Sequence, residues 1–321
     1  MSANEELKVK AQKALDIAKS VVFGQEKMLD GILAGLVCEG HLLIEGMPGL
    51  GKTLSVSVMS RLCDLAFKRI QFTPDLLPSD LVGTMIYNQE KGEFTTKLGP
   101  IFTQILLADE INRSPAKVQA ALLEAMAERQ VTIGENTHKL QSPFVVLATQ
   151  NPIDQEGTYN LPEAQMDRFM MKINVNYPSF EAEKSILDLK DNALDKLPRV
   201  LNTQDLHMMK EVVESIYVDE KIKDLIIKIV QATRPKGPGF PKMFEGAILA
   251  GASPRAAIWL HKLGRFMAFM DGKDFVSPEH LLRIIPNVLG HRIILSYEAT
   301  VDNVKGRDVA IKIAQNMIGG S

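Results

Sequence analysis

The stretch IEGMPGLGKTLS (Ile44–Ser55) carries three glycines within six residues, followed directly by a lysine and a threonine. Glycine at this density destabilises helices and strands alike, so we expect this stretch to be a loop. It follows a short apolar run, HLLIE (His41–Glu45), and precedes a pattern with helical spacing. The segment Gly46–Thr53 fits G-x-x-x-x-G-K followed by Ser or Thr, which between a strand and a helix predicts a phosphate-binding loop, or P-loop.

The chemistry of such a loop is carried mainly by its backbone. N–H groups freed from side-chain crowding converge on phosphate oxygens, and the positive end of the following helix adds to the attraction. Lys52 then supplies a point charge to the outer phosphates, and the hydroxyl of Thr53 is offered to Mg²⁺. We therefore expect a bound nucleotide, held by Gly46, Met47, Pro48, Gly49, Leu50, Gly51, Lys52, Thr53 and Leu54.

Short apolar runs alternate with helical patterns through roughly the first 175 residues, which is typical of a parallel sheet covered by helices on both faces. Several runs lack strict alternation, as buried parallel strands do. From residue 179 onward the pattern is helical, so we expect an α/β domain over 1–178 and an all-helical domain over 179–321. The strand candidates are His41–Glu45, Arg69–Thr73, Gln104–Asp109, Phe144–Gln150 and Phe169–Val175.

Composition narrows the class of protein. With 321 residues, 45% of them hydrophobic, the chain can bury a sizeable core. A formal charge of −2 leaves no overall basic field, which argues against nucleic acid as a partner.

No apolar run approaches the roughly 20 residues of a membrane span, and no signal-peptide core is present, so we expect a cytoplasmic protein. Cys38 and Cys63 fall in helix-like apolar patterns, which favours reduced core packing, and the histidines show no metal-ligand spacing.

A second polar feature follows the third strand candidate, where LLADE ends in Asp109 and Glu110. A carboxylate at the carboxyl end of this strand faces the phosphates across the sheet crevice. Asp109 is then the outer-sphere partner of Mg²⁺, and Glu110 is placed to polarise an attacking water as a general base. A base aimed at water favours hydrolysis over a kinase reaction, and the guanine-specific triplet of GTPases is absent from the expected region. We interpret the site as one for hydrolysis of ATP.

Three long segments resemble the MoxR family of AAA+ ATPases. They are ADEINRSPAKVQAALLEAMAERQVTIG (108–134), FVVLATQNPIDQEGTYNLPEAQMDRFMM (144–171) and GASPRAA (251–257). The similarity extends over nearly the whole chain, from FGQE at Phe23 to LSYEA near Glu298. The resemblance implies an AAA+ fold, in which a five-stranded P-loop sheet is followed by an all-helical lid.

The resemblance also implies roles for three further residues. Asn151, at the end of its strand, matches sensor 1, which holds the attacking water or the γ-phosphate together with Glu110. Arg168 matches the arginine finger, which reaches the phosphate of a neighbouring subunit; the alternative is a surface arginine paired with a nearby carboxylate. Arg255 matches sensor 2, which brings the lid onto the nucleotide; the alternative is an ordinary capped helix start after Ser253.

Other positions match the family less specifically. Gly24 and Gln25 match the loop that contacts adenine. Thr73 is a candidate for positioning Glu110, and Arg113 is a candidate for facing the adjacent subunit.

Two segments resemble the family's insertions, namely Leu76–Pro100 and Gln130–Leu140, and the second has the alternation of a hairpin. The chain departs from the family at Asn160, at His280 and over residues 236–249, so the role of this last segment stays open.

For function, the resemblance implies a homo-oligomeric ring, a hexamer, that couples ATP hydrolysis to chaperone-like remodelling, activation or metal or cofactor insertion of a protein client. The sequence shows no metal-ion-dependent adhesion motif of the von Willebrand A type, so we expect any such domain to come from a separate partner chain. One alternative is a nucleic-acid motor or loader, against which the near-neutral charge argues. Another is a binding module that uses ATP only as a switch, against which Glu110, Asn151 and Arg168 argue.

Overall fold

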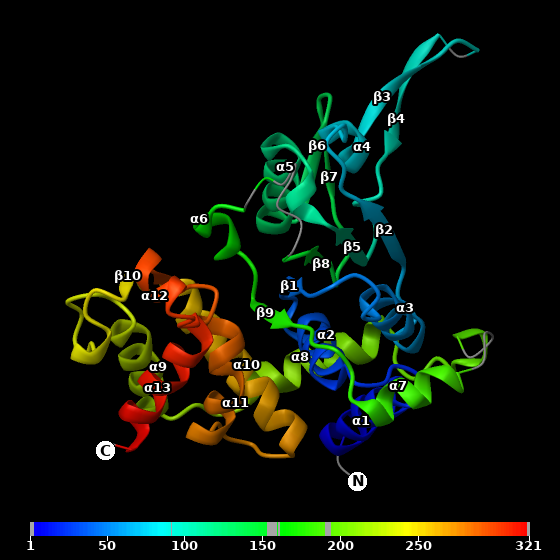
Figure 1. Ribbon diagram of the computed structural model, residues 1–321. Coiled ribbons are helices and arrows are strands. Elements are labelled where there is room, and N and C mark those ends of the chain that lie inside the picture. The colour runs from blue at the N-terminus through cyan, green and yellow to red at the C-terminus, as the bar shows by residue number, and fades with distance from the viewer. Residues whose placement is uncertain (1–2, 91, 153–158, 160, 190–193, 320–321) are drawn as a thin grey trace. The chain divides into compact units, whose positions relative to one another are not determined.

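The computed structural model describes residues 3–90, 92–152, 159, 161–189 and 194–319 (Figure 1). The chain forms two compact units. The sheet unit comprises Lys13–Leu161 and Ile173–Gln204, and the helical unit comprises Met1–Gln12, Pro162–Lys172 and Asp205–Ser321. Residues 173–204 therefore cluster with the sheet, and residues 162–172 cluster with the helices. The division of the chain into domains near residue 178 stays a prediction.

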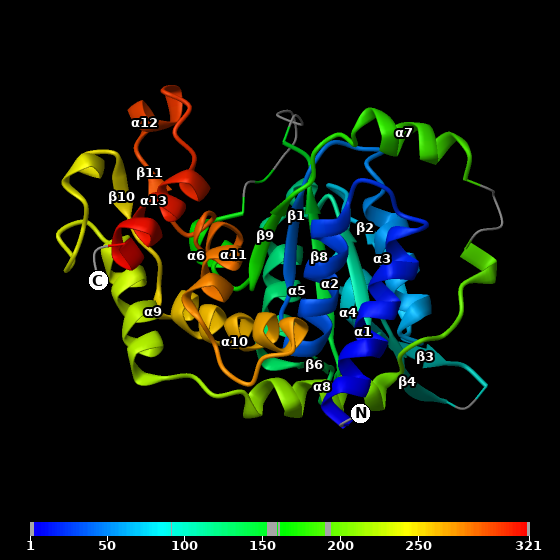
Figure 2. The same ribbon diagram turned by 90° about the horizontal axis from the view of Figure 1, so that it is seen from below.

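The sheet unit is built on five strands in the order β2-β5-β8-β1-β9 (Figure 2). The strands pair in parallel, with Leu42 opposite Leu147 and Ile105 opposite Val145. The predicted parallel P-loop sheet is thus confirmed, and its strands are β1 (Leu42–Glu45), β2 (Phe67–Gln71), β5 (Ile105–Asp109), β8 (Val145–Gln150) and β9 (Met171–Asn174). Because parallel strands share one carboxyl edge, the P-loop, Glu110 and Asn151 emerge at the same edge of the sheet.

Helices cover both faces of this sheet, with α5 on one side and α2 and α3 on the other (Figure 1). The central strands are almost fully buried, as continuous apolar runs predict for a covered parallel sheet. Cys38 and Cys63 are buried in this core, as the sequence predicts. The helices in or entering the sheet unit are α1 (Ala3–Lys19), α2 (Glu26–Cys38), α3 (Lys52–Leu62), α4 (Pro78–Val82), η1 (Ile111–Arg113), α5 (Ala116–Glu128), α7 (Phe180–Leu187) and η2 (Leu194–Lys196).

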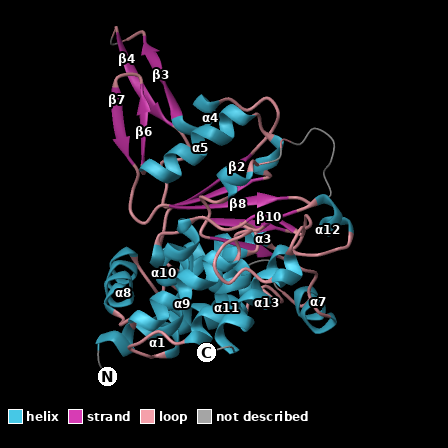
Figure 3. Cartoon of the chain, turned by 90° about the vertical axis from the view of Figure 1, so that its left-hand side faces the viewer, coloured by secondary structure: helices cyan, strands magenta, loops and turns pink. Residues whose placement is uncertain are grey.

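Two antiparallel hairpins lie beside each other on the sheet unit (Figure 3). The first, β3 (Gly83–Asn88) and β4 (Glu93–Leu98), follows α4 within the insertion expected at 76–100. The second, β6 (Gln130–Ile133) and β7 (Asn136–Lys139), confirms the hairpin predicted from sequence alternation. Gly134 has a φ of +61° in the connecting turn, a conformation that glycine adopts without strain.

The helical unit contains one short strand pair that the sequence does not predict. Strands β10 and β11 form an antiparallel ribbon, but their three and two residues are too short for a periodic signal. Within the described residues, no helix of either unit is long and apolar enough to cross a bilayer. The elements are α6 (Glu163–Met166), α8 (Thr203–Ser215), α9 (Glu220–Ala232), η3 (Lys242–Phe244), β10 (Ile248–Ala250), α10 (Pro254–Asp271), α11 (Pro278–Leu289), β11 (Ile294–Leu295), α12 (Tyr297–Val301) and α13 (Gly306–Gly319).

Candidate active site

Glycine is required at different positions of the P-loop for different structural reasons. Gly46 packs against Val175, and a Cβ at this position would lie 2.8 Å from the Val175 Cβ and 2.9 Å from its carbonyl oxygen. Gly49 and Gly51 adopt φ values of +82° and +76°, in the left-handed region that favours glycine. The loop is therefore held close to the segment after β9 at one end and turns sharply before α3 at the other.

The N-terminus of α3 fits an anionic ligand. Among the described residues no side chain caps this end, so its first N–H groups are available to an acceptor outside the helix. A Cβ at Gly49 or Gly51 would meet no described heavy atom within 4 Å, so the loop has room for phosphate groups above it. Backbone donors, the helix dipole and a lysine thus converge here, and the residues present fit the phosphates of a nucleotide.

Lys52, the first residue of α3, bends back over the loop. Its ammonium donates to the carbonyl oxygens of Gly46 and Met47, the latter at 3.3 Å. Burial lowers the pKa of Lys52, although the carboxylates of Asp109 and Glu110 act in the opposite direction. The half-buried ammonium is consequently poorly solvated, and phosphate oxygens would be stronger partners for it than carbonyls.

Asp109, the last residue of β5, is held by both neighbouring strands. Its Oδ1 accepts from the Thr149 hydroxyl of β8 at 2.5 Å. Its Oδ2 accepts from Arg69 of β2, at 2.7 Å from Nη2 and 3.1 Å from Nε. The carboxylate is therefore fixed at the carboxyl edge of the sheet. Arg69 carries no sequence signal for this contact, which depends on the pairing of β2 with β5.

Glu110 has an unusual backbone conformation, with φ 56° and ψ 51°. Non-glycine residues in this region are strained and concentrate at functional sites. The Thr149 hydroxyl accepts from the Glu110 N–H at 2.8 Å, so one hydroxyl links both acidic residues. The carboxylate Oε2 accepts from Gln71 Nε2 at 2.8 Å and from Arg113 Nη1 at 2.9 Å.

The structure thus brings Gln71, rather than Thr73, onto Glu110. β2 ends at Gln71, two residues before the predicted end, and Gln71 lies opposite Asp109 in the register. The side chain of Thr73 instead bonds Asp75, and this hydrogen bond lowers the pKa of the Asp75 carboxyl. Arg113, expected to be available to a neighbouring subunit, contacts Glu110 of its own chain.

The remaining positions predicted in the sheet unit lie around the same edge. Asn151 directly follows β8 and is half-buried. Gln25 is buried and donates from Nε2 to the carbonyl oxygen of Asn176 at 3.2 Å. Gly24 has a φ of +74° and approaches Pro178 so closely that a Cβ would lie 3.0 Å from the proline Cβ. The Gly24–Gln25 loop is therefore packed on the chain that leaves β9.

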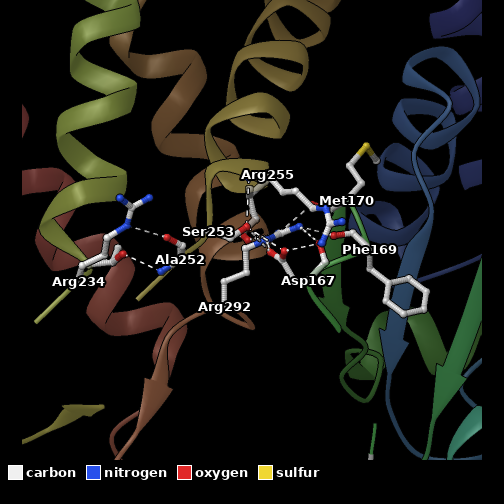
Figure 4. A network of polar contacts seen from close by, with 10 residues as sticks. Asp167, Phe169, Met170, Arg234, Ala252, Ser253, Arg255 and Arg292 are labelled. Atoms are coloured by element: carbon white, nitrogen blue, oxygen red, sulfur yellow. Dashed lines mark hydrogen bonds and ion pairs between the residues drawn. The ribbon is translucent and has the colours of Figure 1, made fainter. Parts of the chain in front are cut away.

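Arg168 and Arg255 both belong to the helical unit, and Figure 4 shows Arg255 beside Asp167, the residue that precedes Arg168. Arg255 lies in the first turn of α10, which is capped by the Ser253 hydroxyl and has Pro254 at its first position. Its Nη1 pairs with Asp167 Oδ2 at 3.1 Å. Burial opposes ionisation of Asp167, but hydrogen bonds from Ser253, Arg292 and Arg255 hold the pKa of its carboxyl below the usual value. Arg292 is a buried member of this network that sequence reasoning missed.

A P-loop sheet with an acidic pair at its carboxyl edge, together with a helical unit, defines an AAA-type ATPase. The family model described as "ATPase family associated with various cellular activities (AAA)" matches residues 41–171. The model described as "AAA lid domain" matches residues 242–312. The crystal structure of a Cytophaga hutchinsonii protein assigned to the ATPases superimposes with a TM-score of 0.90 at 45% identity, covering 97% of this chain and 95% of that one.

Curated relatives narrow the class. The chain is 43% identical over 307 residues to Chaperone MoxR1 of Mycobacterium tuberculosis, covering 95% of this chain and 81% of that protein. It is 28% identical over 297 residues to Protein MoxR of Methylorubrum extorquens, covering 87% and 86%. The chain belongs to the MoxR family of AAA+ ATPases and is an ATP hydrolase.

Proposed function

We propose that the chain assembles into a homo-oligomeric ring, a hexamer, that uses ATP hydrolysis for chaperone-like remodelling, activation or cofactor-insertion maturation of a protein client. The observation that carries the hydrolytic part is the anchored acidic pair, Asp109 and Glu110, at the sheet edge that also carries the P-loop. A relative that is 43% identical is named a chaperone, which supports the proposal that the substrate is a client protein.

In this proposal each group at the sheet edge has one task. The N–H groups of Gly49–Thr53 and the ammonium of Lys52 bind the phosphates of ATP. The Thr53 hydroxyl and Asp109 would hold Mg²⁺, which would supply positive charge that offsets the charge of the phosphates. Glu110 accepts a proton from the attacking water, and Asn151 orients that water.

Gln71 and Arg113 provide a way to control when Glu110 acts as a base. Both donate to Oε2, so this oxygen is occupied in the observed arrangement. Glu110 acts as a base through Oε1, or after one of these donors has turned away. The pair therefore provides a means to hold hydrolysis back until the site is complete.

We assign the two arginines of the helical unit to a shared site. Arg168 acts on the ATP of the neighbouring subunit, where a guanidinium offsets the charge that develops on the phosphate oxygens. Arg255 acts as sensor 2 on the nucleotide of its own chain. The Gly24–Gln25 loop contacts adenine.

We place the protein in the cytoplasm, where ATP is supplied, and we infer that any von Willebrand A-type function belongs to a separate partner chain.

The test is capture of the client by Glu110→Gln loaded with ATP. The amide is nearly isosteric with the carboxylate but cannot take a proton, so the ATP state persists and retains the client. Lys52→Ala, which loses ATP, is the matched control. Specific retention of one protein by Glu110→Gln and not by Lys52→Ala supports the proposal. Retention of DNA instead of protein, in a salt-dependent manner, would favour a nucleic-acid motor.

A further inference from the structure

Arg292 follows α11 and is almost completely buried, with 1% of its side chain exposed. Its Nε donates to Asp167 Oδ1 at 2.8 Å, and its Nη2 donates to the backbone oxygens of Asp167 and Phe169 at 2.9 and 2.5 Å. Its Nη1 donates to the backbone oxygens of Met170 and Val288 at 3.3 and 2.5 Å. The five N–H donors of the guanidinium thus match five acceptors.

Four of those five acceptors belong to residues 167–170 (Figure 4). Arg292 therefore holds the backbone immediately before Arg168 and at the two residues after it. Phe169 and Met170 are themselves fully buried, which fixes the same segment from the apolar side. The backbone that carries Arg168 is consequently held by hydrogen bonds on both sides of this residue.

Stability alone does not account for this arrangement. A buried ion pair is weak evidence for stability, because desolvation of both charges offsets most of their attraction, and apolar side chains of similar volume commonly serve as well. An apolar residue could not, however, form directional hydrogen bonds to the backbone oxygens of Asp167, Phe169 and Met170. A planar guanidinium with five donors does so, and a lysine ammonium does not.

The same carboxylate also receives Arg255. Asp167 Oδ2 accepts from Arg255 Nη1 at 3.1 Å, and the Ser253 hydroxyl donates to the carboxylate at 2.8 and 2.9 Å. Asp167 therefore joins the start of α10 to the segment that carries Arg168. If Arg255 takes another partner, the Asp167 carboxylate, adjacent to Arg168, loses one of the two arginines that pair with it.

We propose that Arg292, with Asp167, is the positioning residue for Arg168, and that it aims this arginine toward the ATP of the neighbouring subunit. The inference rests on the proposed shared site. Misplacement of a catalytic group by about 1 Å costs on the order of 100-fold in rate. Loss of the five hydrogen bonds of Arg292 is therefore expected to lower the measured rate of ATP hydrolysis. The effect belongs to the subunit that donates Arg168, not to the subunit that binds the ATP.

The test uses mixed assemblies in which one chain binds ATP and the other donates the arginine. Arg168→Ala chains are the acceptors, and Lys52→Ala chains, which bind no ATP themselves, are the donors. Arg292→Lys is then added to the donor. Arg283→Lys is the matched control, because Arg283 also pairs with an aspartate of the helical unit, Asp271, at 2.8 Å, and its guanidinium donates to this aspartate rather than to residues 167–170.

The inference predicts that Lys52→Ala donors with Arg283→Lys restore activity like Lys52→Ala alone, and that donors with Arg292→Lys restore ~10- to 100-fold less. Adding Arg292→Lys to the Arg168→Ala acceptor should leave the restored rate nearly unchanged. An equal loss from either placement would show a general structural role and overturn the inference. Equal restoration by all donors would overturn it as well.

Failure of the proposed function gives a different result, because then Lys52→Ala donors restore nothing even without a further substitution. Mixing is established by gel filtration, and folding by the thermal midpoint of each variant. If Arg292→Lys does not fold, Asp167→Asn replaces it, with Asp271→Asn as its control. Asp167→Asn keeps the volume and one acceptor oxygen, and the same loss is expected when the donor carries it. Only the donor placement is compared for this variant, because in the acceptor it also removes the carboxylate that pairs with Arg255.

Discussion

Acidification should destabilise the sheet unit through one buried histidine, His41, which precedes β1. Its ring is 5% exposed. Nδ1 accepts from the Val146 N–H at 3.0 Å, and Nε2 lies 3.2 Å from the Met126 carbonyl oxygen. These partners assign the neutral ring with its proton on Nε2. A second proton on Nδ1 would face the Val146 N–H, so protonation breaks the link between β8 and β1.

The magnitude follows from the pKa difference between the folded and unfolded chain. Burial lowers the pKa of His41 to about 4, against 6.5 for an exposed histidine, while the Met126 carbonyl acts in the opposite direction. The folded state thus binds fewer protons than the unfolded state between these values. Stability is complete above pH ~6.5 and falls as the pH drops toward 4, by ~3 kcal/mol in total at about 1.4 kcal/mol per unit.

The assay is denaturant unfolding of the wild type and His41→Asn at several pH values from 7 to 4. The asparagine oxygen can still accept from Val146, and the side chain does not titrate. His41→Asn should be less stable at pH 7, and the difference should shrink by ~3 kcal/mol toward pH 4. His207→Asn, at an exposed histidine of α8, is the control. A difference between wild type and His41→Asn that stays constant with pH would refute the reasoning.

Two predictions concern the nucleotide directly. Lys52→Ala should abolish tight ATP binding in calorimetry, since it removes the side-chain cation of the P-loop, and affinity within a few-fold of wild type would contradict its role. Glu110→Gln should bind ATP and fail to hydrolyse it; turnover at the normal rate would remove Glu110 from the catalytic step.

The strands of the sheet can be predicted because each one is encoded by residues that are close together in the sequence. Each buried strand is a continuous apolar run, and the P-loop combines glycines whose backbone conformations few other residues adopt. The hairpin at Gln130–Lys139 follows from alternation and a glycine turn. The ribbon of β10 and β11 is missed because strands of three and two residues carry no period.

The contacts around the acidic pair are less predictable because they depend on register. β2 is an edge strand with exposed residues, so its end could not be placed from hydrophobicity, and a shift of two residues exchanges Thr73 for Gln71. Arg292 is missed for a related reason. It lies 125 residues from Asp167 in sequence, and a single arginine after a helix looks like surface charge until its burial is known.

The shared site is the central claim, and the rate of ATP hydrolysis by an equimolar mixture of Arg168→Ala and Lys52→Ala tests it most directly. Each variant alone should be nearly inactive, the first with ATP binding retained. After subunit exchange, about a quarter of the interfaces join an intact Lys52 to an intact Arg168, so the mixture should reach up to about a quarter of the wild-type rate. A mixture that stays as inactive as its components, after exchange has been demonstrated, would contradict the shared site.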